Sequence, residues 1–129
     1  MRILVDTHLL LWAAARSDRL PAEARELLES PENDISYSAA SLWEIAIKIG
    51  LRRADFNVDL VRLRAALPGM GLNELPVTGA HAERVVGLPD VHKDPFDRLL
   101  VAQSLAEPMV LLTNDPVLVN YGSAVRVVT

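Results

Sequence analysis

The chain has 129 residues and a mass of 14.2 kDa, with 50% hydrophobic residues and a mean hydropathy of +0.20. This length predicts a single domain, residues 1–129, with a substantial core and no room for a second one. The apolar runs are far shorter than the roughly 18–20 residues of a membrane-spanning helix, so no membrane segment is expected. Cysteine is absent, which excludes disulfides and thiolate metal sites. Met1 leads directly into an apolar strand, so we expect a cytoplasmic protein without a signal peptide.

The formal net charge is −4, from 13 basic and 17 acidic residues. Taken alone, this charge argues against a protein that binds nucleic acid through bulk positive charge. If some of the acids were metal ligands, however, two bound divalent cations would cancel the formal charge. The net charge therefore neither supports nor excludes a nucleic-acid substrate.

The first half of the chain alternates between short apolar strands and helices. Pro21 near a first turn and Gly50 after a last turn are typical helix boundaries. The pattern predicts a strand over 2–5, a helix from Asp6 or Thr7, an amphipathic helix that ends before Pro31, a strand over 34–38 and a helix over 39–50.

The second half continues in the same way, without a hairpin signal between any two strands. The predicted elements are a helix over 58–67, a strand over 72–75, a helix over 79–86, a helix over 95–106, a strand over 109–113, a short helical turn over 116–120 and a final strand over 124–128. Parallel strands need crossover connections, and helices supply them here. We therefore predict an α/β fold, a doubly wound and mainly parallel sheet with helices on both faces.

Four aspartates each have an ordinary structural explanation. Asp6 follows a strand and precedes a helix, and Asp94 and Asp115 each precede a proline, so all three suit a helix N-cap. Asp97 suits the first turn of a helix, where the helix dipole favours an acid. None of these positions indicates a functional site by itself.

Glu44 has structural explanations as well. It can form a capping box with Ser41 or a surface ion pair with Lys48. The remaining residues of this helix are mostly apolar, which predicts that the helix is buried or in an interface nearly all round. Its polar side, which carries these three residues, then faces either open solvent or a hydrated site.

The acids indicate more together than singly. In doubly wound sheets, ligands bind beyond the carboxyl ends of the strands, where the winding reverses. We expect Asp6 and Asp115 just beyond two strands, and Glu44 and Asp97 in the first turns of helices. If the strands over 2–5 and 109–113 are neighbours, the four carboxylates converge in one crevice.

Such a cluster requires a cation. Two carboxylates about 4 Å apart repel by roughly 4 kcal/mol at an effective dielectric constant of 20. Oxygen ligands without cysteine or an obligatory histidine select a hard ion, Mg²⁺ or Mn²⁺. Acids with such ions perform phosphoryl transfer or phosphodiester hydrolysis, in which one ion generates the hydroxide nucleophile and another stabilises the leaving oxygen.

The sequence offers few other sites. It contains neither a phosphate-binding loop, nor a dinucleotide-binding glycine motif, nor a zinc-protease motif. Trp12 and Trp43 are interpreted as anchors in the core or in an interface. His8 and His92 flank the predicted crevice, and we interpret them as partly exposed polar residues rather than as substrate contacts.

Four segments of the sequence resemble the PIN-domain nucleases, and within them the VapC-type toxins of bacterial toxin–antitoxin pairs. The segments are LVDTHLLLWAA with Asp6, SAASLWEIAIKIGL with Glu44, VHKDPFDRLLVAQ with Asp94 and Asp97, and LLTNDPVLVNYG with Asp115. Successive acids from Asp6 to Glu44, Asp97 and Asp115 are 38, 53 and 18 positions apart. The resemblance covers essentially the whole chain.

The resemblance implies a sheet of five parallel strands and an acidic pocket that binds Mg²⁺ or Mn²⁺. It also implies cleavage within single-stranded regions of RNA. Asp6, Glu44, Asp97 and Asp115 match the acidic quartet of the family, and Thr113 matches the small hydroxyl residue beside the last acid. Asp94 is then a cap or an auxiliary acid. Such toxins are typically homodimers, neutralised by an antitoxin protein whose tail fills the groove beside the active site.

The main hypothesis is therefore a Mg²⁺- or Mn²⁺-dependent endoribonuclease. In it, Asp6, Asp97 and Asp115 bind metal, Glu44 binds metal or orients the attacking water, and Lys93 and Arg98 are possible contacts for RNA phosphates. The alternative is a catalytically inactive relative that binds RNA or a partner protein. A receiver-like phosphoacceptor ranks below both, since the chain has no lysine after its last strand.

Overall fold

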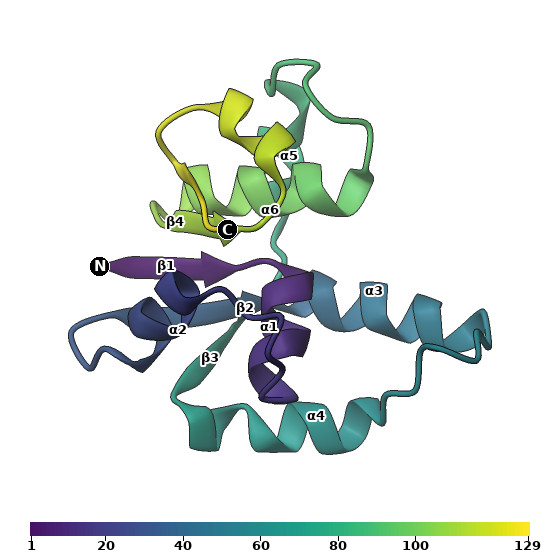
Figure 1. Ribbon diagram of the computed structural model, residues 1–129. Helices are drawn as coiled ribbons and strands as arrows, with labels where there is room; N and C mark the ends of the chain where they lie inside the picture. Colours follow the sequence, from purple (N-terminus) through teal and green to yellow (C-terminus); the bar gives the residue numbers. More distant parts are fainter.

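The computed structural model describes residues 1–129, which form one α/β unit around a five-stranded sheet (Figure 1). All strand pairs are parallel, and the strand order is β3-β2-β1-β4-β5. The strands are β1 (Arg2–Val5), β2 (Asp34–Ser38), β3 (Leu72–Leu75), β4 (Val110–Thr113) and β5 (Val125–Val127). The predicted fold class, a doubly wound parallel sheet with helices on both faces, is confirmed.

The helices connect these strands as crossovers. The helices are α1 (Thr7–Ala14), α2 (Ala22–Glu29), α3 (Ala39–Gly50), α4 (Leu60–Ala66), α5 (Gly79–Val86) and α6 (Pro95–Ala106), with short 3₁₀ helices η1 (Pro68–Met70) and η2 (Pro116–Tyr121). Figure 1 shows α5 and α6 on one side of the sheet and α1, α2 and α4 on the other. No helix is long and apolar enough to cross a membrane.

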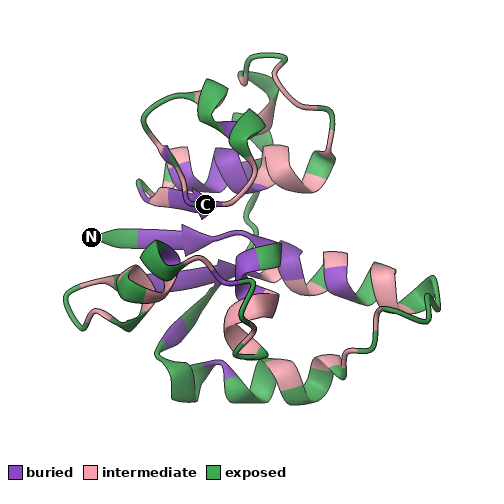
Figure 2. Ribbon diagram, viewed as in Figure 1, coloured by how far each residue is buried: buried purple, intermediate pink, exposed green.

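Two hydrophobic cores lie on the two faces of the sheet, because neighbouring residues of a strand point to opposite faces. In β1, Ile3 and Val5 belong to the core under α1 and α2, whereas Leu4 belongs to the core under α6. In β4, Leu112 belongs to the core under α1 and α2, and Leu111 belongs to the core under α6. The central strands β1 and β4 and the inner side of α6 are buried, while most of α4 and the C-terminal end of α3 are exposed (Figure 2). Burial on both faces explains why β1 and β4 read as continuous apolar runs.

The winding of the sheet reverses between β1 and β4. From β1 the chain moves to β2 and β3 on one side, whereas β4 and β5 extend the sheet on the other side. The backbone N–H of Asp6 donates to the carbonyl of Leu112 at 3.0 Å, which extends the pairing just past the end of β1. The predicted neighbourhood of these two strands is confirmed, and their carboxyl ends meet where doubly wound sheets bind ligands.

Helix α3 spans Ala39–Gly50, as predicted, and differs from the sequence-based expectation in two details. Ser38 is its N-cap, so Glu44 lies in the second turn rather than the first. Ser41 is buried inside the helix and forms no capping box with Glu44. Both details follow from the side chain of Ser38, which accepts the N–H of Ala40 and caps the helix in place of Ser41. Within the single chain, Trp43 is 65% exposed and Ile47 is 42% exposed, so the apolar side of α3 is only partly covered.

Candidate metal centre at the carboxyl ends of the central strands

Asp6 is the N-cap of α1 and is almost fully buried. One carboxylate oxygen accepts the backbone N–H of Leu9 at 2.8 Å, and the other accepts the hydroxyl of Thr113. The Thr113 hydroxyl also accepts the backbone N–H of Asp115 at 3.1 Å. The buried Thr113 therefore joins two of the predicted acids, one from each central strand.

Glu44 reaches the same end of the sheet from α3. Its Oε1 accepts the hydroxyl of Thr7 at 2.7 Å, and that hydroxyl lies 2.9 Å from the hydroxyl of Ser41. Its Oε2 lies 3.4 Å from Nζ of Lys48, one helical turn further along. The polar side of α3 thus faces the end of β1 rather than open solvent, and the contact with Thr7 fixes one carboxylate oxygen.

Asp94 and Asp97 occupy different positions at the start of α6. Asp94 is the N-cap, and one of its oxygens accepts the N–H groups of Phe96 at 2.8 Å and of Asp97 at 3.2 Å. Asp97 lies in the first turn of the helix, as expected. The predicted capping role of Asp94 is confirmed, whereas an additional role beside the metal stays a prediction.

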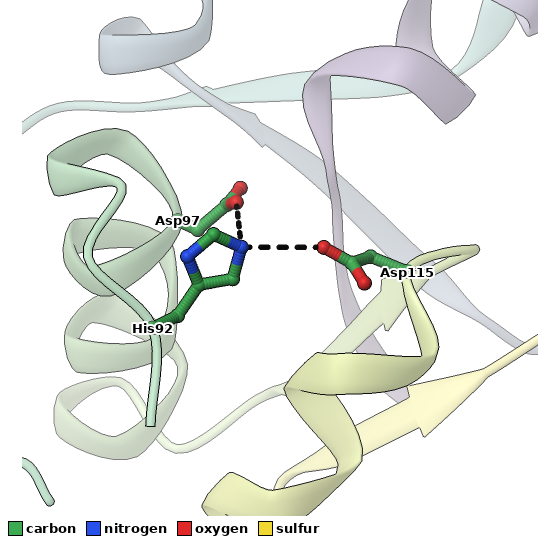
Figure 3. A group of neighbouring side chains, drawn as sticks. All are labelled: His92, Asp97 and Asp115. Atoms are coloured by element: carbon green, nitrogen blue, oxygen red, sulfur yellow. Dashed lines mark ion pairs between the residues drawn. The ribbon is translucent and has the colours of Figure 1, made fainter. Parts of the chain in front are cut away.

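Asp97 and Asp115 approach each other across His92 (Figure 3). Nε2 of His92 lies 3.5 Å from Oδ2 of Asp97 and 3.5 Å from Oδ2 of Asp115. One potential ligand atom from each residue lies within 4.8 Å of the other two. The three side chains come from the loop before α6, from α6 itself and from the junction of β4 and η2, and they point toward one another.

Burial and mutual repulsion disfavour the charged forms of these acids. Burial, together with the negative charges of Asp94, Glu44 and Asp6, raises the pKa of Asp97 to about 7, against the opposing effect of His92. Burial also raises the pKa of Asp6, although the hydrogen bonds from Thr113 and Leu9 act in the other direction. The influence of Asp6 and Glu44 on Asp97 places these three acids in one electrostatic environment.

This donor set fits a hard divalent cation. Asp97 and Asp115 supply carboxylate oxygens at the distance that one ion can bridge, and His92 supplies an imidazole nitrogen. Asp6 and Glu44 are held beside this group by Thr113 and Thr7. A cation would relieve the repulsion that raises the pKa of Asp97. The ligand set expected from the sequence contained only oxygen atoms. The structure adds one candidate nitrogen donor, His92.

The two basic residues of this segment differ in their surroundings. Lys93 is exposed. Arg98 is tied to the protein, because its guanidinium donates to the backbone carbonyls of Val85 at 3.3 Å and Pro89 at 3.1 Å. It also donates to the carbonyl of His92 at 3.4 Å. These bonds give Arg98 a structural task, so a contact with RNA stays a prediction for both residues.

His92 is the residue that sequence reasoning missed. Its backbone N–H donates to the hydroxyl of Tyr121 at 3.1 Å, and its Nδ1 accepts the N–H of Asp94 at 3.1 Å. The second bond turns Nε2 toward the two acids. The available signal was its position two residues before a helix N-cap, where a side chain accepts a backbone N–H. That position alone does not reveal that Asp115 lies on the other side of the ring.

The fold is similar to those of several solved structures. It matches a chain of VapBC2 from Rickettsia felis bound to a promoter DNA fragment, with a TM-score of 0.69, 14% identity and full coverage of both chains. A toxin–antitoxin complex from Klebsiella pneumoniae matches with a TM-score of 0.68 and 22% identity, over 96% of this chain and 95% of that chain. FitAB bound to a DNA fragment matches with a TM-score of 0.62 and 17% identity, over 88% and 85%. At these identities, the likeness establishes the fold.

The sequence itself gives the family. No curated protein sequence matches the chain. The sequence profile of the PIN domain family, however, matches residues 3–123, a range that includes all four predicted acids and both residues that join them, Thr7 and Thr113. Since this match spans nearly the whole chain, the protein belongs to the PIN domain family.

Proposed function

We propose that this protein is a Mg²⁺- or Mn²⁺-dependent endoribonuclease, the toxin of a VapBC-type toxin–antitoxin pair. The observation that carries the proposal is the convergence of Asp97, Asp115 and His92 beside Asp6 and Glu44, where the sheet changes its winding direction. Membership of the PIN domain family and the likeness to chains from toxin–antitoxin complexes support it.

The residues of the site would have different roles. Asp6, Asp97 and Asp115 would hold the cation, with Asp6 oriented by Thr113. A bound divalent ion lowers the pKa of a water and stabilises the charge that develops on the phosphate. Glu44, whose carboxylate is fixed by Thr7, would orient the attacking water or bind the ion. His92, whose Nε2 lies 3.5 Å from an oxygen of both Asp97 and Asp115, would supply a nitrogen ligand to the same ion.

Exposed apolar surface supports binding to other protein chains. Trp43, Ile47 and Leu51 are 65%, 42% and 58% exposed and follow one another at four-residue spacing, so they share one side of α3 and its end. A separate groove of about 850 Å³, lined mostly by apolar residues, lies between α4 and the edge strand β3. Such surfaces mark protein interaction sites. We therefore include a cognate antitoxin and a second copy of the chain as partners in the proposal.

The test is cleavage of a single-stranded RNA by the purified, partner-free protein with Mg²⁺ or Mn²⁺ and with EDTA. We expect cleavage only with metal, and a loss of at least about a hundredfold in Asp97→Asn and Asp115→Asn. Asp90→Asn is the matched control, because Asp90 is exposed in the loop before α6 and makes no side-chain hydrogen bond. It should cleave like the wild type.

Two results would overturn the proposal. If Asp97→Asn cleaved at the wild-type rate, the cluster would not be the catalytic site. If the protein bound no divalent cation in calorimetry and cleaved no RNA, the alternative of a catalytically inactive binding module would replace the nuclease.

A further inference from the structure

A second cavity adjoins the acidic cluster and differs from it in charge. It has a volume of about 310 Å³ and lies between α1, the turn after α1, the end of α3 and the loop that follows α3. Three cations line it, Arg19, Lys48 and Arg53, against a single acid, Asp55. In a chain with a net charge of −4, this concentration of positive charge favours an anionic ligand.

Two of the three cations, the arginines, have no partner in the fold, whereas Lys48 pairs with Glu44. The guanidinium groups of Arg19 and Arg53 form no ion pair and no hydrogen bond with the protein, and both residues are exposed. By contrast, Arg64 and Arg126 pair with glutamates. Free guanidinium groups that line a cavity can bind a phosphate without first breaking an internal contact.

Aromatic rings form the rest of the wall. His8 and Trp12 lie one turn apart on α1 with their ring centroids 6.1 Å from each other, and Phe56 lines the cavity from the loop after α3. Trp12 is half-buried and packs against the core, so its position is fixed. Flat rings beside cations are the combination that binds single-stranded nucleic acid, through base stacking and phosphate contacts.

The cavity is continuous with the acidic cluster. Lys48 lines the cavity and lies 3.4 Å from Glu44, while His8 lies two residues after Asp6 and acts on the charge of that carboxylate. On the Glu44 side, the surface carries acids that suit a metal ion. On the Lys48 side, it carries cations that suit a phosphate. A polynucleotide that crosses the acids can therefore place a neighbouring nucleotide in the cavity.

We propose that this cavity is a nucleotide-binding subsite for single-stranded RNA. Arg19, Arg53 and Lys48 hold a backbone phosphate next to the one that is cleaved, and the base of that nucleotide stacks against Trp12 or Phe56. The inference rests on the proposed function for the identity of the polymer. The binding itself requires neither metal nor catalysis, so it can be tested separately.

The first experiment uses tryptophan fluorescence. The chain has two tryptophans, and Trp43 lies on α3 outside the cavity, against Phe96. In Trp43→Phe, Trp12 is therefore the sole tryptophan and reports on the cavity. Addition of a short single-stranded RNA in EDTA should quench its emission along a saturable curve. Unchanged emission at saturating RNA, together with wild-type affinity of Phe56→Leu in the second experiment, would overturn the proposal, as would the absence of any binding.

The second experiment measures affinity by anisotropy of a fluorescein-labelled single-stranded RNA in EDTA. Arg19→Ala/Arg53→Ala should weaken binding at least about tenfold, and the slope of log K against log salt should fall by about 0.7 for the one phosphate contact that is lost. Phe56→Leu should weaken binding by about fivefold or more if the base stacks there. The charge-matched control is Arg62→Ala/Arg84→Ala, two exposed arginines outside the cavity, which should bind like the wild type.

The results separate this inference from the proposed function. Equal affinities for Arg19→Ala/Arg53→Ala and its control would refute the subsite, even if metal-dependent cleavage were intact. Loss of affinity in that variant alone would support the subsite, even if no metal gave cleavage. A labelled single-stranded DNA of the same sequence shows whether the cavity distinguishes the two sugars.

Discussion

Asp94 accepts the backbone N–H of Asp97 at 3.2 Å, and its negative charge raises the pKa of the same residue. One side chain thus begins α6 and also disfavours ionisation of the acid that faces the candidate metal centre. The two effects use different properties, since capping needs a hydrogen-bond acceptor and the electrostatic effect needs a charge. Asparagine at position 94 accepts a hydrogen bond but carries no charge, so it separates the capping effect from the electrostatic effect.

We predict that Asp94→Asn lowers the pKa of Asp97 and leaves the stability of α6 nearly unchanged, because asparagine is an equally good N-cap. Asp94→Ala should lower the same pKa but cost about 1 kcal/mol of stability. Carboxyl carbon NMR titration and chemical denaturation measure the two quantities. If Asp94→Asn left the pKa of Asp97 unchanged, the charge of Asp94 would not act on it.

A second prediction concerns the pH dependence of stability without metal. The pKa of Asp97 is about 7 in the folded protein and 3.8 when unperturbed, so between these values the folded state keeps a proton that the unfolded state has lost. Stability should therefore fall as pH rises from about 4 to about 7, by at most about 4 kcal/mol. Urea denaturation in EDTA measures this loss.

Asp97→Asn provides the control, because it cannot ionise and should be more stable than the wild type at pH 8 but not at pH 4. Mn²⁺ should reverse the difference at pH 8, since it stabilises the folded wild type. Equal pH profiles for the two proteins would contradict the raised pKa.

The bonds of Arg98 give a third prediction. Removal of its guanidinium leaves the carbonyls of Val85, Pro89 and His92 without this donor, so Arg98→Ala should lose about 2 kcal/mol of stability. Lys93→Ala, at an exposed site in the same segment, should change stability by less than about 0.5 kcal/mol. Chemical denaturation compares the two. If Arg98→Ala lowered only RNA affinity, Arg98 would be a substrate contact rather than a structural one.

Thr113 supports the fourth prediction. In Thr113→Val, an oxygen of the buried Asp6 and the N–H of Asp115 lose their partner, which should cost about 1–3 kcal/mol. The pKa of Asp6 should rise further, since the Thr113 hydrogen bond lowers it. Denaturation and carboxyl NMR test both effects. Thr113→Ser keeps the hydroxyl and should retain the wild-type pKa; a raised value in that variant would contradict the role of the bond.

The sequence predicted the strands and the helix bounds well, because both depend on local patterns. Buried parallel strands require apolar runs such as Arg2–Val5 and Val110–Thr113, and an aspartate followed by proline predicted the start of α6. That β1 and β4 are neighbours was a condition of the predicted crevice, and only the structure shows it. The turn of α3 that carries Glu44 was also less accessible, since Ser38 and Ser41 are both good N-cap residues.

The sequence placed His92 beside the crevice but did not show that its ring lies between Asp97 and Asp115. The bond from the N–H of Asp94 to its ring is local, whereas its backbone is held by Tyr121 and Arg98, which lie on other elements. Likewise, the charged cavity joins Arg19 to Arg53, which no pattern in the sequence connects. Local periodicity predicts the helices and strands. The positions of loops that meet across the fold depend on tertiary contacts, which the local pattern does not contain.

The pairing of β1 with β4 has a consequence for synthesis on the ribosome. Asp6 is made more than a hundred positions before Thr113, whose hydroxyl joins it to Asp115. Because a chain is made from its N-terminus, the acidic cluster cannot assemble until β4 and Asp115 have also left the ribosome. A nascent or prematurely ended chain that lacks β4 therefore carries only part of the acids.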